Sequence, residues 1–377
     1  IIMNNQKRIF IIAGEPSGDH HAADYIKEHS KINPNIHFDA FGQNEIGKTT
    51  AKIIYNTENI SVIGIIEVIA KYREILRALK IAKDYIKKNK PNLIILVDYI
   101  EFNLKIAKFA KSLGIPVLFY IAPQVWAWRE RRAKSFIESI DYLAVIFPFE
   151  EIYFKKYTDN VTYVSHPLSK RSDLITCIKD YNQRKIDLGI FPGSRESEIK
   201  NNLHLMVDCV QKNKKENIRI FYANETSKLI LENLLPSEYH EYLVSGKDTN
   251  KVSDCKKALC ASGTITLELA LLEIPMIIMY KLSYFSYLIM KSLINVKYIG
   301  LVNLILGNSI GSAPVVKEFI QPSYSDQVDI MVELNKIDQD EFYRNSIIDK
   351  YKSVRNKLSI RSSEKLSDIA ENMLDSI

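Results

Sequence analysis

Residues 8–19 read Arg8-Ile-Phe-Ile-Ile-Ala-Gly-Glu-Pro-Ser-Gly-Asp19, an apolar run that leads through a glycine-containing turn into a polar, helix-compatible stretch. The same local pattern recurs in the second half as Asp187-Leu-Gly-Ile-Phe-Pro-Gly-Ser-Arg-Glu-Ser-Glu198. A short run of Ile, Leu and Phe is typical of a buried parallel strand, and the tight turn from strand to helix favours glycine. A helix start after such a turn offers free N–H groups and a positive dipole end, which suit a phosphate. The repeat predicts two Rossmann-like domains with a cleft between them.

Strand-like and helix-like segments alternate through both halves of the chain, which at 377 residues is too long for one ordinary core. This alternation predicts an α/β fold of doubly wound parallel sheets. The expected strands are Ile9–Ala13, His37–Phe41, Leu93–Asp98, Val117–Ile121, Tyr142–Ile146, Thr162–Val164, Leu188–Phe191, Ile218–Tyr222, Leu243–Ser245, Lys257–Ala261 and Met276–Tyr280. The expected helices include Val68–Lys88, Phe102–Leu113, Ile199–Lys212 and Thr264–Leu272.

The domain boundaries follow from where this alternation pauses. We expect a first domain over residues 1–170, a linker that starts near His166-Pro167-Leu168, and a second domain over residues 183–340. From residue 341 to 377 the chain is polar and helical without a strand signal. We expect this last segment to pack back on the first domain.

Cysteine usage and hydropathy indicate the compartment. The four cysteines have neither a CxxC spacing nor a histidine cluster nearby, which fits a reduced cytosolic compartment. No signal peptide is expected at the N-terminus. The longest uncharged stretch, Tyr298–Val316, contains three glycines and a proline. We therefore expect buried strand and loop there rather than a transmembrane helix.

Positive charge is concentrated in the first domain. Between Lys71 and Lys134 there are fifteen Lys/Arg and five Asp/Glu, a local net charge of +10, whereas the whole chain carries +6. A solvated helix surface, an anionic membrane surface and nucleic acid all remain open explanations. The stretch from Ser61 to Lys80 begins apolar and becomes amphipathic, so it is either a buried core helix or a surface that dips into a bilayer.

A carboxylate is expected at the mouth of the first sheet. Asp98 ends the apolar strand Leu93-Ile-Ile-Leu-Val97, and open α/β sheets bind their ligands at the carboxyl ends of strands. A partly desolvated carboxylate there could act as a general base, although an N-cap for the next helix is equally compatible with the position. Glu101 and Asn103 lie close by and could share either role.

The second half carries the better candidates for phosphate binding. Arg195 follows Pro192-Gly193-Ser194, where a guanidinium could clamp a phosphate or pair with Glu196 or Glu198. Ser262, Gly263 and Thr264 precede a helix-forming run, so the N–H groups of that helix start could hold a diphosphate. Glu268 could accept a hydrogen bond from a ribose hydroxyl or simply complement the helix dipole.

Three further motifs give weaker indications. The first turn, with Glu15, Ser17, Gly18 and Asp19, is neither a complete GxGxxG nor a P-loop. Trp126 and Trp128 lie beside a basic cluster, which suits a membrane interface or a sugar-stacking wall as well as ordinary packing. Asp338-Gln-Asp340 matches a DxD metal motif, but it falls in a polar helix start, and no other set has metal-ligand spacing.

Several of these motifs occur together in one order and spacing, from about residue 8 to 320. In this combination the chain resembles lipid-A-disaccharide synthase, a family with the GT-B architecture of two Rossmann-like domains facing across a cleft. The motifs are Ala13-Gly-Glu-Pro-Ser-Gly-Asp19, Ile121-Ala-Pro-Gln-Val-Trp-Ala-Trp-Arg129, Phe147-Pro-Phe-Glu150, His166-Pro-Leu168, Pro192-Gly-Ser-Arg195 and Ala261-Ser-Gly-Thr-Ile-Thr-Leu-Glu268.

The resemblance implies an inverting, metal-independent glycosyl transfer without a cofactor. The donor would be UDP-2,3-diacylglucosamine and the acceptor 2,3-diacylglucosamine 1-phosphate, giving a tetraacyl disaccharide 1-phosphate and UDP. It assigns the base to Asp98, with Glu15 and Glu101 as further catalytic candidates. The resemblance implies UDP binding by Arg195, Ser262, Gly263, Thr264 and Glu268, and it places Asn303 near the cleft. The further residues that we expect to bind substrate are Ser17, Asp19, Asn103, Trp126 and His166.

This sequence departs from the family pattern at three places. The family's Asp-x-Pro-Asp-Phe-Asn is Asp98-Tyr-Ile-Glu-Phe-Asn103 here, so the proline is lost and the second acid is Glu101. Ser165 stands where the family usually has glycine before His166, and Val302 replaces a proline before Asn303.

The implied substrates also account for the basic, partly apolar first domain. Each buried methylene is worth roughly 0.8 kcal/mol, so multi-acyl glycolipids stay in a bilayer. We expect a peripheral protein on the cytoplasmic face of the inner membrane of a Gram-negative-type bacterium, bound through residues 63–76 and the Lys71–Lys134 charges. The expected partners are the two glycolipids and an anionic membrane surface, not nucleic acid, and a homodimer is left open. The alternatives are another GT-B UDP-sugar enzyme, such as a UDP-N-acetylglucosamine 2-epimerase, and a basic binding protein without catalysis.

Overall fold

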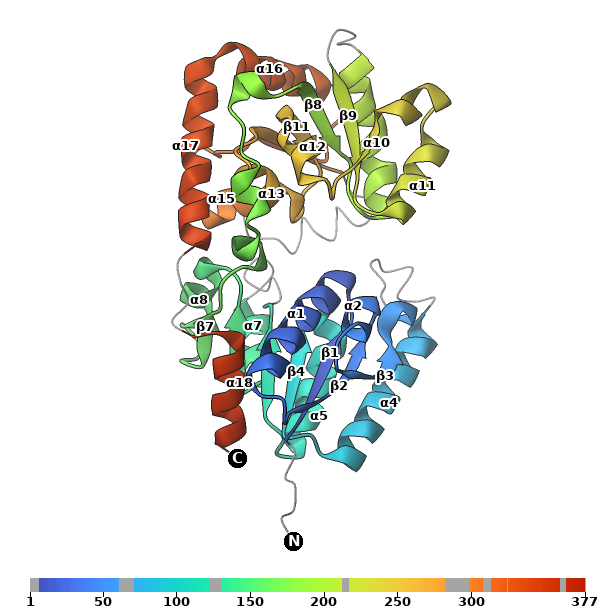
Figure 1. The fold of residues 1–377 in the computed structure, drawn as a ribbon, viewed down its shortest axis with the longest axis vertical. Helices are drawn as coiled ribbons and strands as arrows, with labels where there is room; N and C mark the ends of the chain where they lie inside the picture. Colours follow the sequence, from blue (N-terminus) through green and yellow to red (C-terminus); the bar gives the residue numbers. More distant parts are fainter. Residues whose placement is uncertain are drawn as a thin grey trace. The chain divides into compact units, whose positions relative to one another are not determined.

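The computed structural model of the chain describes residues 7–60, 71–122, 130–211, 217–281, 298–307, 313–323, 325–359 and 364–376. It divides into two compact units, one formed by Ile1–Pro167 with Arg361–Ile377 and the other by Leu168–Ile360. Each unit is a parallel sheet with helices packed on it (Figure 1). The α/β prediction is confirmed, and each unit is described by itself below.

The first unit has a seven-stranded sheet in the order β3-β2-β1-β4-β5-β6-β7, with every pairing parallel. Its strands are β1 (Arg8–Ala13), β2 (His37–Gly42), β3 (Lys52–Asn56), β4 (Leu93–Val97), β5 (Val117–Tyr120), β6 (Tyr142–Val145) and β7 (Val161–Tyr163). Its helices are α1 (Pro16–Ile32), α2 (Asn44–Gly47), α4 (Tyr72–Asn89), α5 (Ile100–Ser112), α7 (Glu130–Ile137), α8 (Pro148–Phe154) and α18 (Leu366–Asp375).

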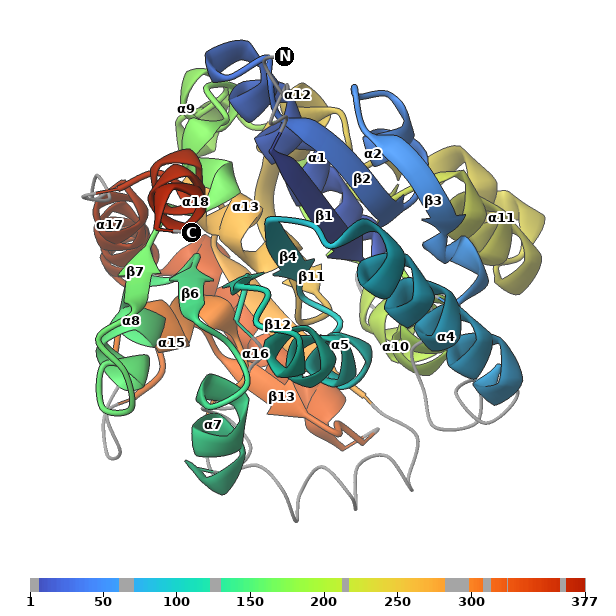
Figure 2. The ribbon, with the colours of Figure 1, turned by 90° about the horizontal axis from the view of Figure 1, so that it is seen from below.

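Burial explains why these strands could be recognised. All five residues of β4 are buried, as expected for a central parallel strand. One large core cluster joins the sheet to the buried faces of α4, α5 and α7. Helices α1 and α18 contact each other and β4 and lie on the other side of the sheet (Figure 2). The sheet is therefore covered on both faces, which is the doubly wound arrangement.

The second unit has a six-stranded parallel sheet in the order β10-β9-β8-β11-β12-β13. Its strands are β8 (Ile186–Phe191), β9 (Ile218–Tyr222), β10 (Leu243–Ser245), β11 (Cys255–Cys260), β12 (Met276–Tyr280) and β13 (Glu318–Ile320). Its helices are α9 (Asp173–Thr176), α10 (Glu196–Gln211), α11 (Glu225–Leu234), α12 (Thr249–Ser253), α13 (Ile265–Leu271), α15 (Leu301–Ile305), α16 (Asp326–Gln339) and α17 (Glu341–Leu358).

Two strands were not predicted, and both lie at the edge of a sheet. β3 has the sequence Lys-Ile-Ile-Tyr-Asn with exposed ends, and β13 is three residues long and only partly buried. An edge strand is not covered on all sides, so it lacks the continuous apolar run of a central strand. The expectation of a strand within residues 298–316 is wrong for 301–305, which form α15. Within the described residues, no helix is both long and apolar enough to cross a bilayer.

The C-terminal helices belong to different units. α17 packs against α13, α15 and α16 of the second unit, and only the segment from Arg361 onward belongs to the first. The expectation that all of residues 341–377 return to the first domain is therefore wrong for α17. Its buried side chains, among them Tyr351 and Val354, complete the core of the second unit. α18 does pack on the first unit, beside α1.

Candidate active site

The strand order in each sheet marks one place where a ligand is expected. Connections leave β1 toward β2 on one side and β4 toward β5 on the other, so the order reverses between β1 and β4. In the second sheet it reverses between β8 and β11. Ligands of open α/β sheets bind at the carboxyl ends of the strands at such a switch point. The turns that end these four strands carry most of the residues singled out in the sequence.

The turn after β4 holds its backbone in an unusual conformation. Asp98 and Tyr99 both have positive φ, at 50° and 44°, in the left-handed region that non-glycine residues avoid. The side chain of Asn103, fully buried on α5, donates from Nδ2 to the carbonyls of Val97 (3.2 Å) and Asp98 (2.8 Å). Such strain persists only where the surroundings impose it. Asn103 therefore clamps the turn that presents Asp98, and the substrate contact predicted for Asn103 stays a prediction.

Tyr99 joins this turn to the one after β1. Its ring lies over Gly14, where an added Cβ would approach the ring to 2.2 Å, and its hydroxyl donates to the carbonyl of Ile60 (2.8 Å). Burial, with a contribution from the charge of Glu15, raises the pKa of Tyr99 to about 12. Glu15 thus lies near Tyr99, and the half-buried carboxylates of Glu15 and Asp98 border the same switch point.

The remaining candidates of the first turns differ in their surroundings. Asp19 is buried, and its carboxylate accepts the backbone N–H groups of Gln43 (2.6 Å) and Glu45 (2.8 Å) at the start of α2. The Asp19 carboxylate therefore stabilises the fold, and these contacts do not support the substrate contact that we predicted for it. Ser17 is exposed on the first turn of α1. The Glu101 side chain is 76% exposed and lies 3.7 Å from Arg132, so it lacks the desolvation expected of a general base.

In the second unit, the turn after β8 is built around glycine. Gly193 has φ 120°, and an added Cβ would meet the Glu198 side chain at 2.8 Å. Glu198 accepts from the backbone N–H of Ser194 (3.3 Å) and pairs with Arg195 (3.0 Å). Burial raises the pKa of Tyr280, the last residue of β12; the charge of Glu198 adds to this shift and that of Arg195 opposes it. The half-exposed Arg195 guanidinium therefore lies at the carboxyl edge of the sheet.

The turn after β11 presents open backbone. Gly263 has φ 157°, and a Cβ built there meets nothing within 4 Å. Thr264 stands at the N-cap of α13 and is exposed, but its hydroxyl makes no capping bond; Ser262 is half-buried. The first N–H groups of a helix have no partner within the helix and can bind an anion. One turn further on, Glu268 pairs with Arg171 at 3.1 Å, and burial raises the pKa of Glu268.

His166 lies in the first unit after β7. It is buried, its ring packs on that of Phe147 with centroids 5.0 Å apart, and burial lowers its pKa to about 3. The residue before it, Ser165, has φ 72°, a conformation that the usual glycine adopts without strain. His166 is therefore neutral at neutral pH. Trp126, the remaining candidate of the first domain, lies outside the described residues, as does Trp128.

The Asn303 side chain forms hydrogen bonds within the second unit. Its Oδ1 accepts the N–H groups of Val315 (2.9 Å) and Val316 (3.1 Å), and its Nδ2 donates to the Val316 carbonyl and to Glu318. The predicted substrate contact is not supported, because the amide holds the loop before β13.

The two carboxylates of the DxD motif also bind other residues of the protein. Asp338 pairs with the buried Lys257 and accepts from the Tyr181 hydroxyl at 2.5 Å, and Asp340 caps α17 through the N–H of Tyr343. No group of three or more His, Cys, Asp or Glu side chains suited to a metal ion occurs within the described ranges.

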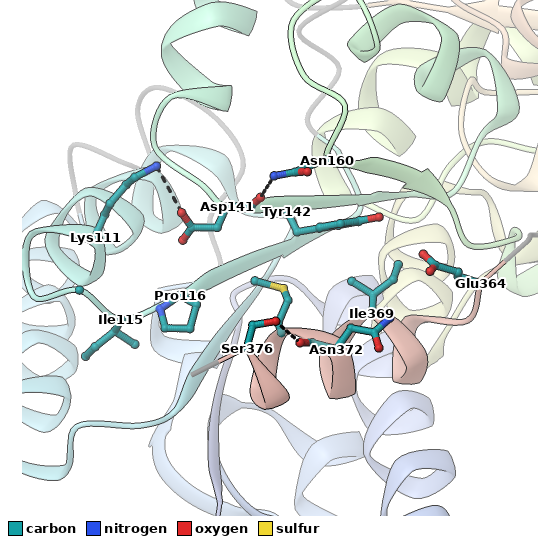
Figure 3. Close-up of a pocket in the computed structure, with 12 residues that line it drawn as sticks. Lys111, Ile115, Pro116, Asp141, Tyr142, Asn160, Glu364, Ile369, Asn372 and Ser376 are labelled. Atoms are coloured by element: carbon teal, nitrogen blue, oxygen red, sulfur yellow. Dashed lines mark hydrogen bonds and ion pairs between the residues drawn. The ribbon is translucent and has the colours of Figure 1, made fainter.

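A separate pocket of about 720 Å³ lies in the first unit (Figure 3). Pro116, Asp141 and Asn160, which line it, each precede a strand, so it opens at the amino edge of the sheet. α18 contributes Asn372 to its wall, and Ser376, which directly follows α18, also lines it. Because parallel sheets bind ligands at the opposite edge, we do not assign the chemistry to this pocket.

Two residues of these turns were not predicted from the sequence. Tyr99 follows Asp98 directly, yet only the left-handed turn shows that its ring seals Gly14. Arg171 is 97 residues from Glu268 in the chain, and a cation within the expected linker gives no signal of that contact.

Comparison with solved structures supports the fold. The UDP-GlcNAc 2-epimerase from Neisseria meningitidis, solved bound to UDP-GlcNAc, has a TM-score of 0.61 at 14% identity, covering 98% of this chain and 100% of the other. The glycotransferase of kitacinnamycin has a TM-score of 0.59 at 12% identity, again with 98% and 100% coverage. At these identities the similarity concerns the architecture alone, which glycosyltransferases and epimerases share.

Sequence comparison is more specific. A family model described as lipid-A-disaccharide synthetase matches residues 9–373. The lipid-A-disaccharide synthase of Nitrosococcus oceani is 32% identical over 99% of this chain and 97% of its own length, and that of Syntrophotalea carbinolica is 34% identical over 90% and 88%. The full-length match and the GT-B fold together show that this chain belongs to the lipid-A-disaccharide synthase family, as a glycosyltransferase of lipid A biosynthesis.

Proposed function

We propose that this enzyme transfers 2,3-diacylglucosamine from UDP to the 6-hydroxyl of 2,3-diacylglucosamine 1-phosphate, with inversion at the anomeric carbon. The products are a β-1′,6-linked tetraacyl disaccharide 1-phosphate and UDP. The observation that carries the proposal is the division of residues between the switch points: carboxylates at β1/β4, and a cation with a glycine turn before α13 at β8/β11.

In this proposal the first unit handles the acceptor. Asp98 removes the proton from the acceptor hydroxyl as that oxygen attacks the anomeric carbon. A general base of this kind contributes typically 10²- to 10⁴-fold to the rate. The rigid turn supports the assignment, because Asn103 and the Tyr99 ring fix the backbone that carries the carboxylate. Glu15 contributes negative charge beside it.

The second unit holds the donor nucleotide. UDP leaves as an anion and needs no proton, unlike the leaving group of a glycosidase. Arg195 and the N–H groups at the start of α13 stabilise the charge that develops on the diphosphate. Glu268 accepts from the ribose. This set of side chains provides the stabilisation without a bound metal, so we expect turnover to persist after extensive treatment with a chelator.

Activity on the acylated substrates is the direct test. Purified enzyme is incubated with both glycolipids in detergent, and UDP and disaccharide are quantified together. We expect equimolar formation of the two products and no conversion of water-soluble UDP-N-acetylglucosamine. Epimerisation of that nucleotide sugar, or no product from folded enzyme, would sink the proposal.

We further propose that the first unit docks on the cytoplasmic face of the inner membrane. Tyr72 is 54% exposed and Leu76 is 44% exposed on α4, and the exposed Arg73, Arg77 and Lys80 lie beside them. Each basic residue near an anionic surface contributes about 1 kcal/mol. Residues 63–70 of the expected contact region lie outside the described residues.

Vesicle binding tests this docking. The R73E/R77E/K80E variant should lose at least about tenfold in affinity for vesicles containing anionic phospholipid, with little change for neutral vesicles. A matched charge reversal in the second unit, at Lys200, Lys228 and Lys247, should retain binding. Equal losses in both variants would show a general charge effect rather than a docking surface.

A further inference from the structure

Arg171 connects three helix starts of the second unit. It precedes α9, where its Nε donates to Asp173 Oδ1 at 3.1 Å and its Nη2 pairs with Oδ2. Nη2 also donates to Oγ1 of Thr249, the first residue of α12, at 2.9 Å. Nη1 donates to Glu268 Oε2, on α13, at 3.1 Å.

The contacts to Asp173 and Thr249 leave the guanidinium little freedom. Its fork meets both oxygens of Asp173, and the Thr249 hydroxyl in turn donates to Asp173 Oδ2 at 2.6 Å. This ion pair lowers the pKa of Asp173 to about 2, chiefly through the hydrogen bond from Arg171. A planar fork fixed in this way directs Nη1 more rigidly than a lysine could.

The consequence for Glu268 is electrostatic and geometric. Burial raises the pKa of Glu268, while the charge of Arg171 and its hydrogen bond oppose that shift. Within the described part of the chain, Arg171 is the side chain that donates a hydrogen bond to this carboxylate, and it contacts Oε2 only. Oε1 is then oriented by a fixed partner and remains able to accept from a ligand.

Arg184 of the same unit shows the contrasting, purely structural case. It is buried and donates to backbone carbonyls, those of Lys179, Cys255, Leu272 and Glu273. Arg171 instead is partly exposed and donates hydrogen bonds to side chains, one of which is the Glu268 carboxylate.

We propose that Arg171 is a positioning residue for nucleotide recognition, which holds Glu268 oriented to accept hydrogen bonds from the ribose hydroxyls of UDP. This inference rests on the proposed function, since it requires UDP to bind beside Glu268. It also assigns a role to a residue of the expected linker, which no motif in the sequence indicates.

Titration calorimetry with UDP, 2′-deoxy-UDP and 3′-deoxy-UDP separates positioning from structural support. We expect the wild type to bind at least one deoxy nucleotide about tenfold more weakly than UDP, the loss of roughly one charge-assisted hydrogen bond. R171Q should bind UDP about tenfold more weakly and no longer distinguish the deoxy nucleotides, and R171K should recover part of the discrimination. The R171Q/E268Q double variant should bind no more weakly than E268Q, because Arg171 acts through Glu268.

The matched control is R355Q. Arg355 pairs with Glu273 (3.0 Å), just beyond α13, so its loss should lower thermal stability without changing the discrimination between nucleotides. If R171Q discriminates like the wild type, or if the wild type binds UDP but ignores the ribose hydroxyls, the positioning role is wrong. If the wild type binds no UDP at all, the proposed function fails first.

A pH series gives an independent readout. Among the described residues, the charged groups that act on Glu268 are Arg171 and Asp173. With Arg171 removed, the negative Asp173 remains, so the Glu268 pKa rises further. UDP affinity of R171Q, divided by that of the wild type, should therefore fall as pH is lowered from 8 to 6. A ratio that does not change with pH would contradict the inference.

Discussion

The two switch points differ in the residues that form their strand-to-helix turns. At β1/β4 the turn uses consecutive left-handed non-glycine residues, Asp98 and Tyr99, held down by Asn103. At β8/β11 the turns use Gly193 and Gly263, and the space beside Gly263 is open. A left-handed non-glycine residue costs about 1–3 kcal/mol, whereas glycine adopts positive φ without that cost.

This difference matches what each site would have to do. A general base must be held at one position relative to the atom it deprotonates, so strain imposed by a buried clamp is useful there. A diphosphate is bound by several backbone N–H groups at once, so the backbone must approach it closely and glycine is the residue that permits this. Substitutions at each turn should therefore affect turnover and nucleotide binding separately.

The largest effect is expected from Asp98→Asn. Turnover should fall by about 10²- to 10⁴-fold, because the amide cannot take a proton, while UDP affinity stays unchanged. Glu101→Gln is the matched control: Glu101 is exposed and paired with Arg132, so this variant should keep near-full turnover. An Asp98→Asn enzyme with normal turnover, or an inactive Glu101→Gln enzyme, would reassign the base.

Arg195→Ala tests the opposite switch point and should affect binding first. Loss of a charged hydrogen-bond donor to a phosphate is worth about 1.5–3 kcal/mol, so we expect the KM for the donor and the Kd for UDP to rise roughly 10- to 100-fold. Lys200→Ala, on helix α10 directly after Arg195, removes an exposed cation paired with Glu196 and should leave both constants unchanged. Equal effects of the two variants would mean that Arg195 acts only through general charge.

Asn103→Ala should release the clamp on the first turn. It removes two buried hydrogen bonds to carbonyls, and we expect a loss of about 1–2 kcal/mol in the free energy of unfolding, measured by urea denaturation. Turnover should fall further than stability accounts for, with UDP affinity preserved, since the second unit is untouched. Loss of stability at normal turnover would show that Asp98 needs no preset geometry.

The sequence predicts the central strands better than the edge strands. Central strands such as β4 were predictable because a strand buried on both faces needs a continuous apolar run. The edge strands β3 and β13 are only partly buried, so their sequences do not show such a run. The fold and the turns that carry Asp98 and Arg195 follow from such local patterns.

Residue roles were less predictable, since one polar side chain can serve a ligand or the protein's own backbone. Asp19 and Asn303 are of suitable type and position for substrate binding, yet their oxygens accept main-chain N–H groups. Arg171 shows the reverse case, because its partner Glu268 is brought near only by the packing of three helix starts. Contacts of this kind depend on tertiary structure that no local pattern encodes.

The smallest effect concerns pH and again separates the units. Burial is the main cause that lowers the pKa of His166 to about 3 and that of His21 to about 4, and both residues belong to the first unit. A folded-state pKa below the unfolded value of 6.5 means that the unfolded chain takes up protons first as the pH drops. The stability contribution is therefore complete above pH 6.5 and is lost progressively toward the folded pKa values.

For His166, which is almost fully buried, the loss between pH 8 and pH 6 should be about 1 kcal/mol. The midpoint of urea unfolding measured at both pH values should show it, and His166→Asn should remove this part of the pH dependence. His204, on α10 of the second unit, is exposed, so His204→Asn serves as the control and should change nothing. An unchanged pH dependence in His166→Asn would mean that the first unit tolerates the imidazolium at this buried position.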